Sequence, residues 1–400
     1  MGVLQDPQVR VRFRSCAILG TYLTVLFLRS WSSLDRIAAD PGYWVFEEAR
    51  TDLSWDFLSG YLYLNFLARL IPAVAAPFPI EFHAVVGGSL SHLVWAGCAM
   101  MLFYTLKQAG YSNSVAYLGG LALVLAPHAS ESSLGNSGPI GFPLLVPLIA
   151  SAAMPAVIKA RPFACAVMAV ASAITTPFTF ICAVIILTRT AVLRERLDRG
   201  TKMFVLSSSL SLWLNLIVIG PGRVLTGNGE KLFLPWNGMG LFWWTGLVGP
   251  VLISAGVLVV WLLSRSRGSR LSHGIALLAV SSTLLQMSLY WLGGIGDRYF
   301  VAPMTLSVLS FLLLIVEWGQ ILPKSRRLLI TTVAVLGIVT PSVKWFSAGN
   351  FLSRGPTWSA EVRRAERECR YSTNEWILLR TGDAKISLPC SYILKSYSPF

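Results

Sequence analysis

Residues 300–319 read FVAPMTLSVLSFLLLIVEWG, and Glu317 is the only charged side chain in this stretch. A helix of this length reaches about 30 Å, the thickness of the hydrocarbon core of a lipid bilayer. Comparable apolar runs recur along most of the chain, separated by short basic breaks or by breaks that contain Gly and Pro. This pattern predicts helices that cross a membrane, because a transmembrane barrel would show alternating segments of about ten residues instead.

The composition supports the same class. Of the 400 residues, 54% are hydrophobic and 13% are charged, which is about half the charge of an ordinary soluble domain. The sequence contains no nucleotide-phosphate loop, no Rossmann glycine fingerprint, no His-Glu-x-x-His motif and no Cys-x-x-Cys pair. We therefore expect an all-α polytopic membrane protein whose partner is the lipid bilayer and not nucleic acid.

The apolar runs predict about eleven transmembrane helices within a multi-span domain of residues 1–342. The first run follows three arginines but lacks a small-x-small cleavage site, so we interpret it as a retained span and not as a signal peptide. The predicted spans are 15–31, 83–105, 113–127, 138–157, 163–176, 177–189, 203–220, 241–263, 271–292, 300–319 and 328–342.

The distribution of basic residues predicts the orientation. With the N-terminus in the cytoplasm, 17 basic residues fall on the inner side and seven on the outer side before the C-terminal tail. This asymmetry satisfies the positive-inside rule. An odd number of spans then places the tail outside, as expected for a multi-pass protein of the plasma (inner) membrane.

Residues 343–400 form a small extracytoplasmic tail in this scheme. Within it, SAEVRRAERECR predicts a helix with Ser359 as its N-cap, and EWILLRTGDAKISL predicts a short hairpin about Gly382. Cys369 and Cys390 are the only cysteines outside the predicted spans. Because the outer compartment is oxidising, we expect them to form a disulfide.

The outer loop, residues 32–82, gathers the carboxylates of this basic protein. Six of the nineteen acidic residues lie between the first span and the apolar run 57–71, namely Asp35, Asp40, Glu47, Glu48, Asp52 and Asp56. One interpretation is a solvated link, since the positive-inside rule leaves acids free to lie outside. The other is a reaction site, because a partly desolvated carboxylate has a pKa suited to a general base. Two or more carboxylates at short spacing could also hold a divalent cation such as Mg²⁺ or Mn²⁺.

The later part of this loop contains an apolar run, residues 57–71. The run stops at Pro72 before it reaches spanning length. We interpret it as an interfacial helix on the outer surface, with Asn65 and Arg69 four residues apart on one face.

The stretch DPGYWVFEEARTD, residues 40–52, resembles the first-loop run Asn-Asp-Gly-Tyr…Glu-Gly-Ala-Arg-Asp of oligosaccharyltransferase catalytic subunits. These subunits belong to the GT-C class of integral-membrane glycosyltransferases, which take sugars from polyprenyl-phosphate donors. The motif's catalytic Asp falls on Pro41 here, and Asp40 stands one position earlier. The resemblance implies a catalytic role for a carboxylate of this loop, with Asp40 first, and Asp35, Glu47 and Asp52 as alternatives.

Three other stretches are similar to smaller bacterial proteins of the GT-C type. SGYLYLNFLARLIP resembles their Gly-Tyr-Leu-His-Leu-x-x-Arg-Leu helix and implies that Tyr61 and Arg69 bind substrate. GDRYFVAP resembles their Arg-Tyr-x-x-x-Pro run and adds Arg298 and Tyr299, and the tail is similar to theirs as well. The loop SESSLGNSGPIGF lacks the Asn-x-x-His-Trp sequence found in those proteins.

Two further outer segments carry candidate substrate contacts. Arg298 could bind a phosphate bidentately, although it could equally pair with Asp297 or extend to the membrane surface. His128, Glu131 and Asn136 lie in a loop between two spans, where they could line a sugar pocket or form a polar loop rich in turn residues.

The function that these features favour is inverting sugar transfer from a polyprenyl-phosphate donor to an extracytoplasmic glycan or lipid acceptor. Asp40 would act as general base on the acceptor hydroxyl, and Arg298 would bind the phosphate. The alternatives are a transporter or flippase for a lipid-linked or anionic substrate, which predicts ionisable residues at mid-membrane depth, and a non-catalytic subunit of an envelope-assembly complex.

Overall fold

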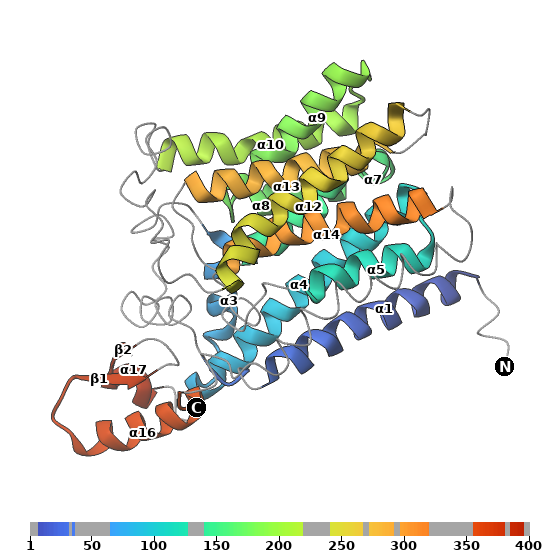
Figure 1. The fold of residues 1–400 in the computed structure, drawn as a ribbon. Helices are drawn as coiled ribbons and strands as arrows, with labels where there is room; N and C mark the ends of the chain where they lie inside the picture. The colour runs from blue at the N-terminus through green and yellow to red at the C-terminus, as the bar shows by residue number, and fades with distance from the viewer. Residues whose placement is uncertain are drawn as a thin grey trace.

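The computed structural model describes residues 7–31, 34–36, 65–126, 140–218, 241–266, 272–291, 297–319, 355–380 and 385–395. In these ranges the chain is a bundle of helices with a small helix-and-hairpin unit at one end (Figure 1). The bundle contains, in chain order, α1 (Pro7–Ser30), α3 (Phe66–Ala75), η3 (Ile80–Phe82), α4 (His83–Gln108), α5 (Asn113–Val124), α6 (Gly141–Ala153), α7 (Ala156–Ala160), α8 (Pro162–Ala173), η5 (Pro177–Thr179), α9 (Phe180–Leu193), α10 (Arg199–Val218), α12 (Leu241–Ser266), α13 (His273–Trp291) and α14 (Asp297–Gly319), where η denotes a 3₁₀ helix.

The predominantly helical fold expected from the apolar runs is confirmed. Ten of the eleven predicted spans fall on these helices, and residues 328–342 lie outside the described ranges. Among the described helices, Ile80–Gln108 and Phe300–Trp318 have the length and composition needed to cross a membrane. Seven other apolar helical stretches are shorter, between 10 and 17 residues.

The predicted span 138–157 is two helices and not one. Helix α6 ends at Ala153 and α7 begins at Ala156, with Met154 at φ −129° and ψ 77° between them. Met154 precedes Pro155, and the ring of a proline disfavours the helical conformation in the residue before it. The proline therefore ends α6, and its own fixed φ suits the start of α7.

Helix α6 lies at the centre of the bundle, and every one of its 13 residues is buried. Its sequence GFPLLVPLIASAA has apolar residues all round, which is what a helix needs when other helices cover all of its sides. The helices α4, α8, α9, α13 and α14 pack against it. The main hydrophobic core accordingly extends from α1 to α14 through α6.

Hydroxyl groups join three of these helices inside the core. The Ser307 hydroxyl of α14 lies 3.1 Å from that of Ser254 in α12 and 2.6 Å from that of Ser282 in α13. Ser307 also donates to the carbonyl of Pro250 at 3.0 Å, and Ser282 donates to the carbonyl of Pro303 at 2.7 Å. Buried hydroxyls satisfied in this way hold α12, α13 and α14 together.

The tail forms a second, smaller core against the start of α4. It contains α16 (Trp358–Tyr371), β1 (Trp376–Arg380), β2 (Lys385–Pro389) and α17 (Cys390–Lys395). The strands pair antiparallel with Leu378 opposite Ser387, which confirms the predicted hairpin, while residues 381–384 lie outside the described ranges. Ile80 and Ala84 of the bundle share this second core with the tail.

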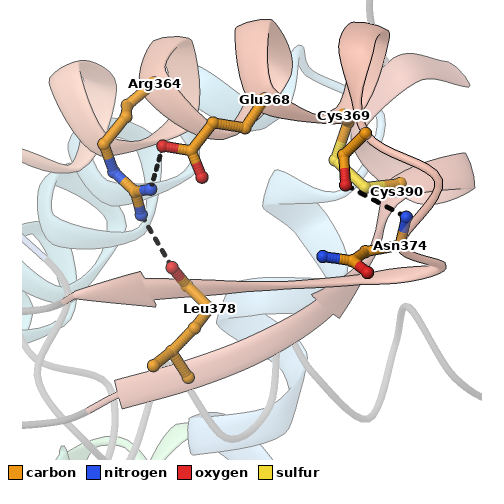
Figure 2. Close-up of a disulfide and its surroundings, with 7 residues drawn as sticks. Arg364, Glu368, Cys369, Asn374, Leu378 and Cys390 are labelled. Atoms are coloured by element: carbon orange, nitrogen blue, oxygen red, sulfur yellow. Dashed lines mark hydrogen bonds and ion pairs between the residues drawn. A yellow bond between two sulfur atoms is a disulfide. The ribbon is translucent and has the colours of Figure 1, made fainter.

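The tail helix begins two residues earlier than the predicted N-cap implies. Its N-cap is Thr357, whose hydroxyl accepts from the backbone N–H of Ala360, so the predicted N-cap at Ser359 is wrong. Cys369 and Cys390 are joined in the expected disulfide, with their Cα atoms 5.4 Å apart (Figure 2). This bond connects the last turn of α16 to the first residue of α17.

The close packing of α5 against α1 and α4 depends on Gly120. A β-carbon there would overlap the hydroxyl of Tyr22 and come within 2.9 Å of the Ala99 carbonyl oxygen, which is backbone and cannot rotate away. We expect Gly120→Ala to destabilise the protein by about 1–3 kcal/mol, the usual effect of overpacking. Thermal unfolding of the purified protein measures this effect. Gly97→Ala is the matched control, because a β-carbon at Gly97 meets nothing within 4 Å; equal losses for both variants would contradict the packing argument.

Candidate functional site

The structure describes part of the predicted site. Asp35 and Arg69 are described with their side chains, and Asp297, Arg298 and Tyr299 form the first turn of α14, where only the backbone is described. The remaining candidates lie outside the described residues, namely Asp40, Glu47, Asp52, Tyr61, His128, Glu131 and Asn136.

Helix α3 differs from the predicted interfacial helix in its C-terminal boundary. The apolar run was expected to end before Pro72, but the helix continues through this residue to Ala75, so that boundary is wrong. Pro72 provides no N–H for a helical bond, yet its carbonyl accepts from the N–H of Ala76 at 2.9 Å. Residues 57–64 lie outside the described part of the chain.

The polar face of α3 points into the protein. Asn65 and Arg69 are one helical turn apart, as expected, and they are only 6% and 7% exposed. The outward face instead carries Leu70 and Val74. A helix lying on a water-covered surface would show the reverse arrangement. Helix α3 therefore directs its polar side chains toward the bundle and apolar side chains away from it.

A polar junction lies beneath α3 at this end of the bundle. The N–H of Phe66 donates to the carbonyl of Ile174 at 3.0 Å, which ties the start of α3 to the end of α8. Next to Ile174, Thr175 and Thr176 are buried, and a β-carbon on Gly141 would lie 2.9 Å from the Cβ of Thr176. The first turn of α6 thus meets the α8–η5 connection here. We call this group, Asn65, Arg69, Thr175, Thr176 and Gly141, the outer junction.

Asp35 holds the tail against the start of the outer loop. One carboxylate oxygen accepts from the N–H of Ser359 at 3.2 Å, and the other accepts from the Ser359 hydroxyl. The carbonyl of Asp35 accepts from the N–H of Trp358 at 2.7 Å. A carboxylate at the N-terminus of a helix is favourable because it satisfies N–H groups and complements the helix dipole. These contacts give Asp35 a structural role at the first turn of α16.

Two more contacts complete this anchor. The indole Nε1 of Trp358 donates to the carbonyl of Ile80 at 2.6 Å, and Trp358 is buried in the second core. The guanidinium of Arg36 donates to the carbonyl of Gly355. We call Asp35, Arg36, Trp358 and Ser359 the tail anchor. It joins segments more than 300 residues apart and fixes the tail beside Asp35 and Arg36 at the start of the outer loop.

Within the tail, Glu361 and Arg364 connect α16 to the hairpin. Arg364 forms an ion pair of 2.9 Å with Glu361. It also pairs with Glu368 at 2.7 Å and donates to the carbonyl of Leu378 at 2.7 Å (Figure 2). Burial raises the pKa of the Glu361 carboxyl, but hydrogen bonds from Arg364 and from the N–H of Arg380 outweigh it and leave this pKa below its ordinary value. Glu361 therefore stays ionised and braces the tail.

Sequence reasoning missed two residues of this region. His83 is buried, and its Nε2 lies 2.9 Å from the carbonyl of Phe78. Trp358 was not singled out, although it joins the tail to the bundle. A tryptophan directly before a predicted helix is a signal of the kind that could have identified it, because large aromatic residues dominate contacts between units.

The part of the chain that the structure describes contains no cluster of three or more His, Cys, Asp or Glu side chains that could hold a metal ion. Most carboxylates of the outer loop lie beyond those residues. The sequence matches no protein-family model and no curated protein. Its chemistry must therefore be inferred from the outer junction, the tail anchor and the sequence of the loop between them.

We expect Asp35→Ala to loosen the tail without unfolding the bundle. The substitution removes the acceptor for the N–H and the hydroxyl of Ser359, a loss of about 1–2 kcal/mol for a helix N-terminus. Hydrogen exchange of the full-length protein should show reduced protection in residues 358–362. Glu375→Ala, which removes an exposed carboxylate from the same unit, is the control. Unchanged protection in the Asp35 variant would show that the anchor does not depend on this side chain.

Proposed function

We propose that this protein is embedded in a membrane and transfers a sugar from a polyprenyl-phosphate donor to an extracytoplasmic glycan or lipid. Its membrane location is supported by the outer surface of the bundle. Large apolar side chains are exposed on α8, α9, α10, α12 and α13, including Phe163, Leu187, Val192, Leu206, Trp213, Ile217, Leu252, Leu262 and Met287. Soluble monomers rarely expose apolar side chains over so many elements, whereas hydrocarbon solvates them without cost.

The proposed orientation is supported by the arrangement of the two ends of the bundle. The tail, η3 and the start of α4 lie at one end, and α7, the end of α9 and the beginning of α1 lie at the other (Figure 1). The second end carries basic residues of the inner set, among them Lys159, Arg161, Arg189 and Arg194. This end would face the cytoplasm, and the disulfide-bonded tail would face the oxidising outer compartment.

A reporter experiment tests the orientation. Alkaline phosphatase fused after Phe400 should be active, because this enzyme folds only outside the cytoplasm, and the same reporter fused at Arg196 between α9 and α10 should be inactive. Activity of the second fusion with inactivity of the first would reverse the topology. That result would also place the acidic loop on the wrong side for an extracytoplasmic acceptor.

The proposed reaction takes place at the outer end of the bundle. Asp40 would accept the proton of the acceptor hydroxyl as this oxygen attacks the anomeric carbon from the side opposite the phosphate. The bond from the anomeric carbon to the phosphate oxygen breaks, so the configuration inverts, and negative charge develops on the leaving polyprenyl phosphate. Arg298 at the start of α14 and buried Arg69 of α3 would stabilise this charge.

The proposed donor needs an apolar surface for its prenyl chain. Such a surface extends from α3 through the turn after it and η3 to the first half of α4. The large apolar residues exposed there are Leu70, Val74, Phe78, Phe82, Val85 and Leu93. The single observation on which the proposal depends is the placement of Arg69 on α3. Arg69 is buried on the inner face of this helix, and Leu70 and Val74 of the apolar surface lie on its outer face. A lipid with an anionic headgroup requires both surfaces at one place.

Asp40→Asn tests the proposed chemistry. The substitution keeps the shape of the side chain but removes the base, so the rate of transfer should fall by about 10²-fold or more while donor affinity stays nearly constant. The assay is sugar transfer from a radiolabelled polyprenyl-phosphate donor with purified protein. Glu48→Gln is the matched control, since it makes the same charge change in the same loop at a residue with no assigned role.

The other variants of the loop decide between outcomes. If Asp40→Asn is active and Asp35→Asn, Glu47→Gln or Asp52→Asn is inactive, another carboxylate is the base. Asp35 is also part of the tail anchor. Loss of activity in Asp35→Asn therefore identifies Asp35 as the base only if hydrogen exchange of the tail is unchanged. Full activity of all four variants would identify the loop as a solvated link and contradict the proposed transfer.

A further inference from the structure

The tail contains a hollow of about 560 Å³ at the C-terminal end of α16. Its wall is formed by the last turns of α16, the connection to β1 and the start of β1, and it includes Cys390 of the disulfide. Figure 2 shows Asn374 beside this disulfide, between the helix and the hairpin. The residues that line the hollow are Arg367, Glu368, Tyr371, Ser372, Asn374, Trp376, Ile377 and Cys390. A volume of this size is typical of small-molecule sites in proteins.

Two aromatic rings at this hollow are left uncovered by the fold. Tyr371 is 90% exposed and Trp376 is 45% exposed. The tail has a complete core of its own, in which Trp358, Val362 and Leu379 are buried. Large aromatic side chains that remain accessible in this way usually supply most of the energy at binding surfaces.

The hollow also presents polar groups in a fixed frame. The N–H of Asn374 donates to the Ser372 hydroxyl at 3.0 Å, which shapes the connection after α16. Arg367 supplies five N–H donors and the Asn374 amide supplies both donors and an acceptor. The disulfide and the Arg364–Glu368 ion pair of 2.7 Å hold the surrounding backbone in place. Little ordering is needed for a ligand to bind, which favours affinity.

We propose that this hollow binds an oligosaccharide. A sugar ring has C–H faces that pack on aromatic rings and an edge of hydroxyl groups that both donate and accept hydrogen bonds. The combination of Tyr371 and Trp376 with Arg367 and Asn374 complements both surfaces of such a ring. A purely apolar ligand would leave the guanidinium and the amide desolvated and without partners, at a cost in free energy.

The position of the hollow favours a glycan over a lipid headgroup. The first residue of α16, Trp358, is fixed to the bundle by its hydrogen bond to the carbonyl of Ile80. The last residue of α16, Tyr371, lines the hollow. The 14 residues between the two ends span about 20 Å. Figure 1 shows α16 extending from the end of the bundle away from its helices. The hollow therefore lies beyond the bundle end, where ligands from the solvent reach it.

This inference rests on the proposed function and specifies its acceptor. The glycan would bind to the tail by units next to the one that reacts, and the tail anchor would hold these units beside the acidic loop through Asp35. Binding of the glycan to the tail would raise the local concentration of the acceptor hydroxyl at the reacting atoms. The tail would then select a polymer over a monosaccharide as acceptor.

The test uses the full-length protein in nanodiscs and three immobilised probes: maltohexaose, xylohexaose and hexagalacturonate. Biolayer interferometry should detect binding to at least one of them, weakened at least tenfold by Tyr371→Ala and by Trp376→Ala. Leu378→Ala is the matched control, because Leu378 has the same exposure as Trp376, follows it by two residues on the same face of β1 and does not line the hollow. This variant should bind within about twofold of the unchanged protein.

Three outcomes would overturn the inference: no binding to any of the three probes at millimolar concentration, equal binding by the ring variants, or ring-dependent binding to phosphatidylglycerol vesicles without binding to the sugars. Binding requires no turnover, so the Asp40→Asn protein should bind the glycan normally. Glycan binding by the unchanged protein without any sugar transfer contradicts only the catalytic proposal, whereas ring-independent glycan binding with intact transfer contradicts only the assignment of the hollow.

Discussion

The complete burial of α6 is the constraint on which the bundle depends. A helix without a polar face must be covered on all sides, and α4, α8, α9, α13 and α14 provide this cover. The break after Ala153 limits the length of the central helix and directs α7 to the end of the bundle that carries basic residues. The first turn of α6 at the other end meets Thr176 and so becomes part of the outer junction.

The tail is held by a small number of specific contacts. Among the described residues, Ile80 and Ala84 are the two that the bundle contributes to the core of the tail. The position of the tail therefore depends strongly on hydrogen bonds from Trp358 to Ile80 and between Ser359 and Asp35. The same aspartate begins the acidic part of the outer loop. A change in the loop at Asp35 therefore reaches the tail directly, which links the proposed catalytic segment to the proposed glycan-binding hollow.

The distribution of polar groups is the feature of the fold that supports the proposed chemistry at a lipid surface. Helix α3 buries Asn65 and Arg69 and exposes Leu70 and Val74, the opposite of a helix on a water-covered surface. The buried centre of α12–α14 is polar through hydroxyl groups, and those that hold the three helices together are satisfied within the protein. This pattern suits a chain that presents apolar side chains outward and keeps polar side chains at helix contacts and at one end.

The sequence by itself determined the helical class, helices within ten of the predicted segments, the tail helix and the hairpin, because each follows from local periodicity or from the composition of a short segment. The Cys369–Cys390 pair was expected because both cysteines lie outside the predicted spans. The candidate site was determined less completely. Asp35 was recognisable as one acid among six, but only the tertiary structure showed that it binds α16, since a contact across more than 300 residues leaves no local pattern. Packing likewise decided that the side chain of Arg69 faces inward and that His83 is buried, because the sequence does not state which side of a helix its neighbours cover.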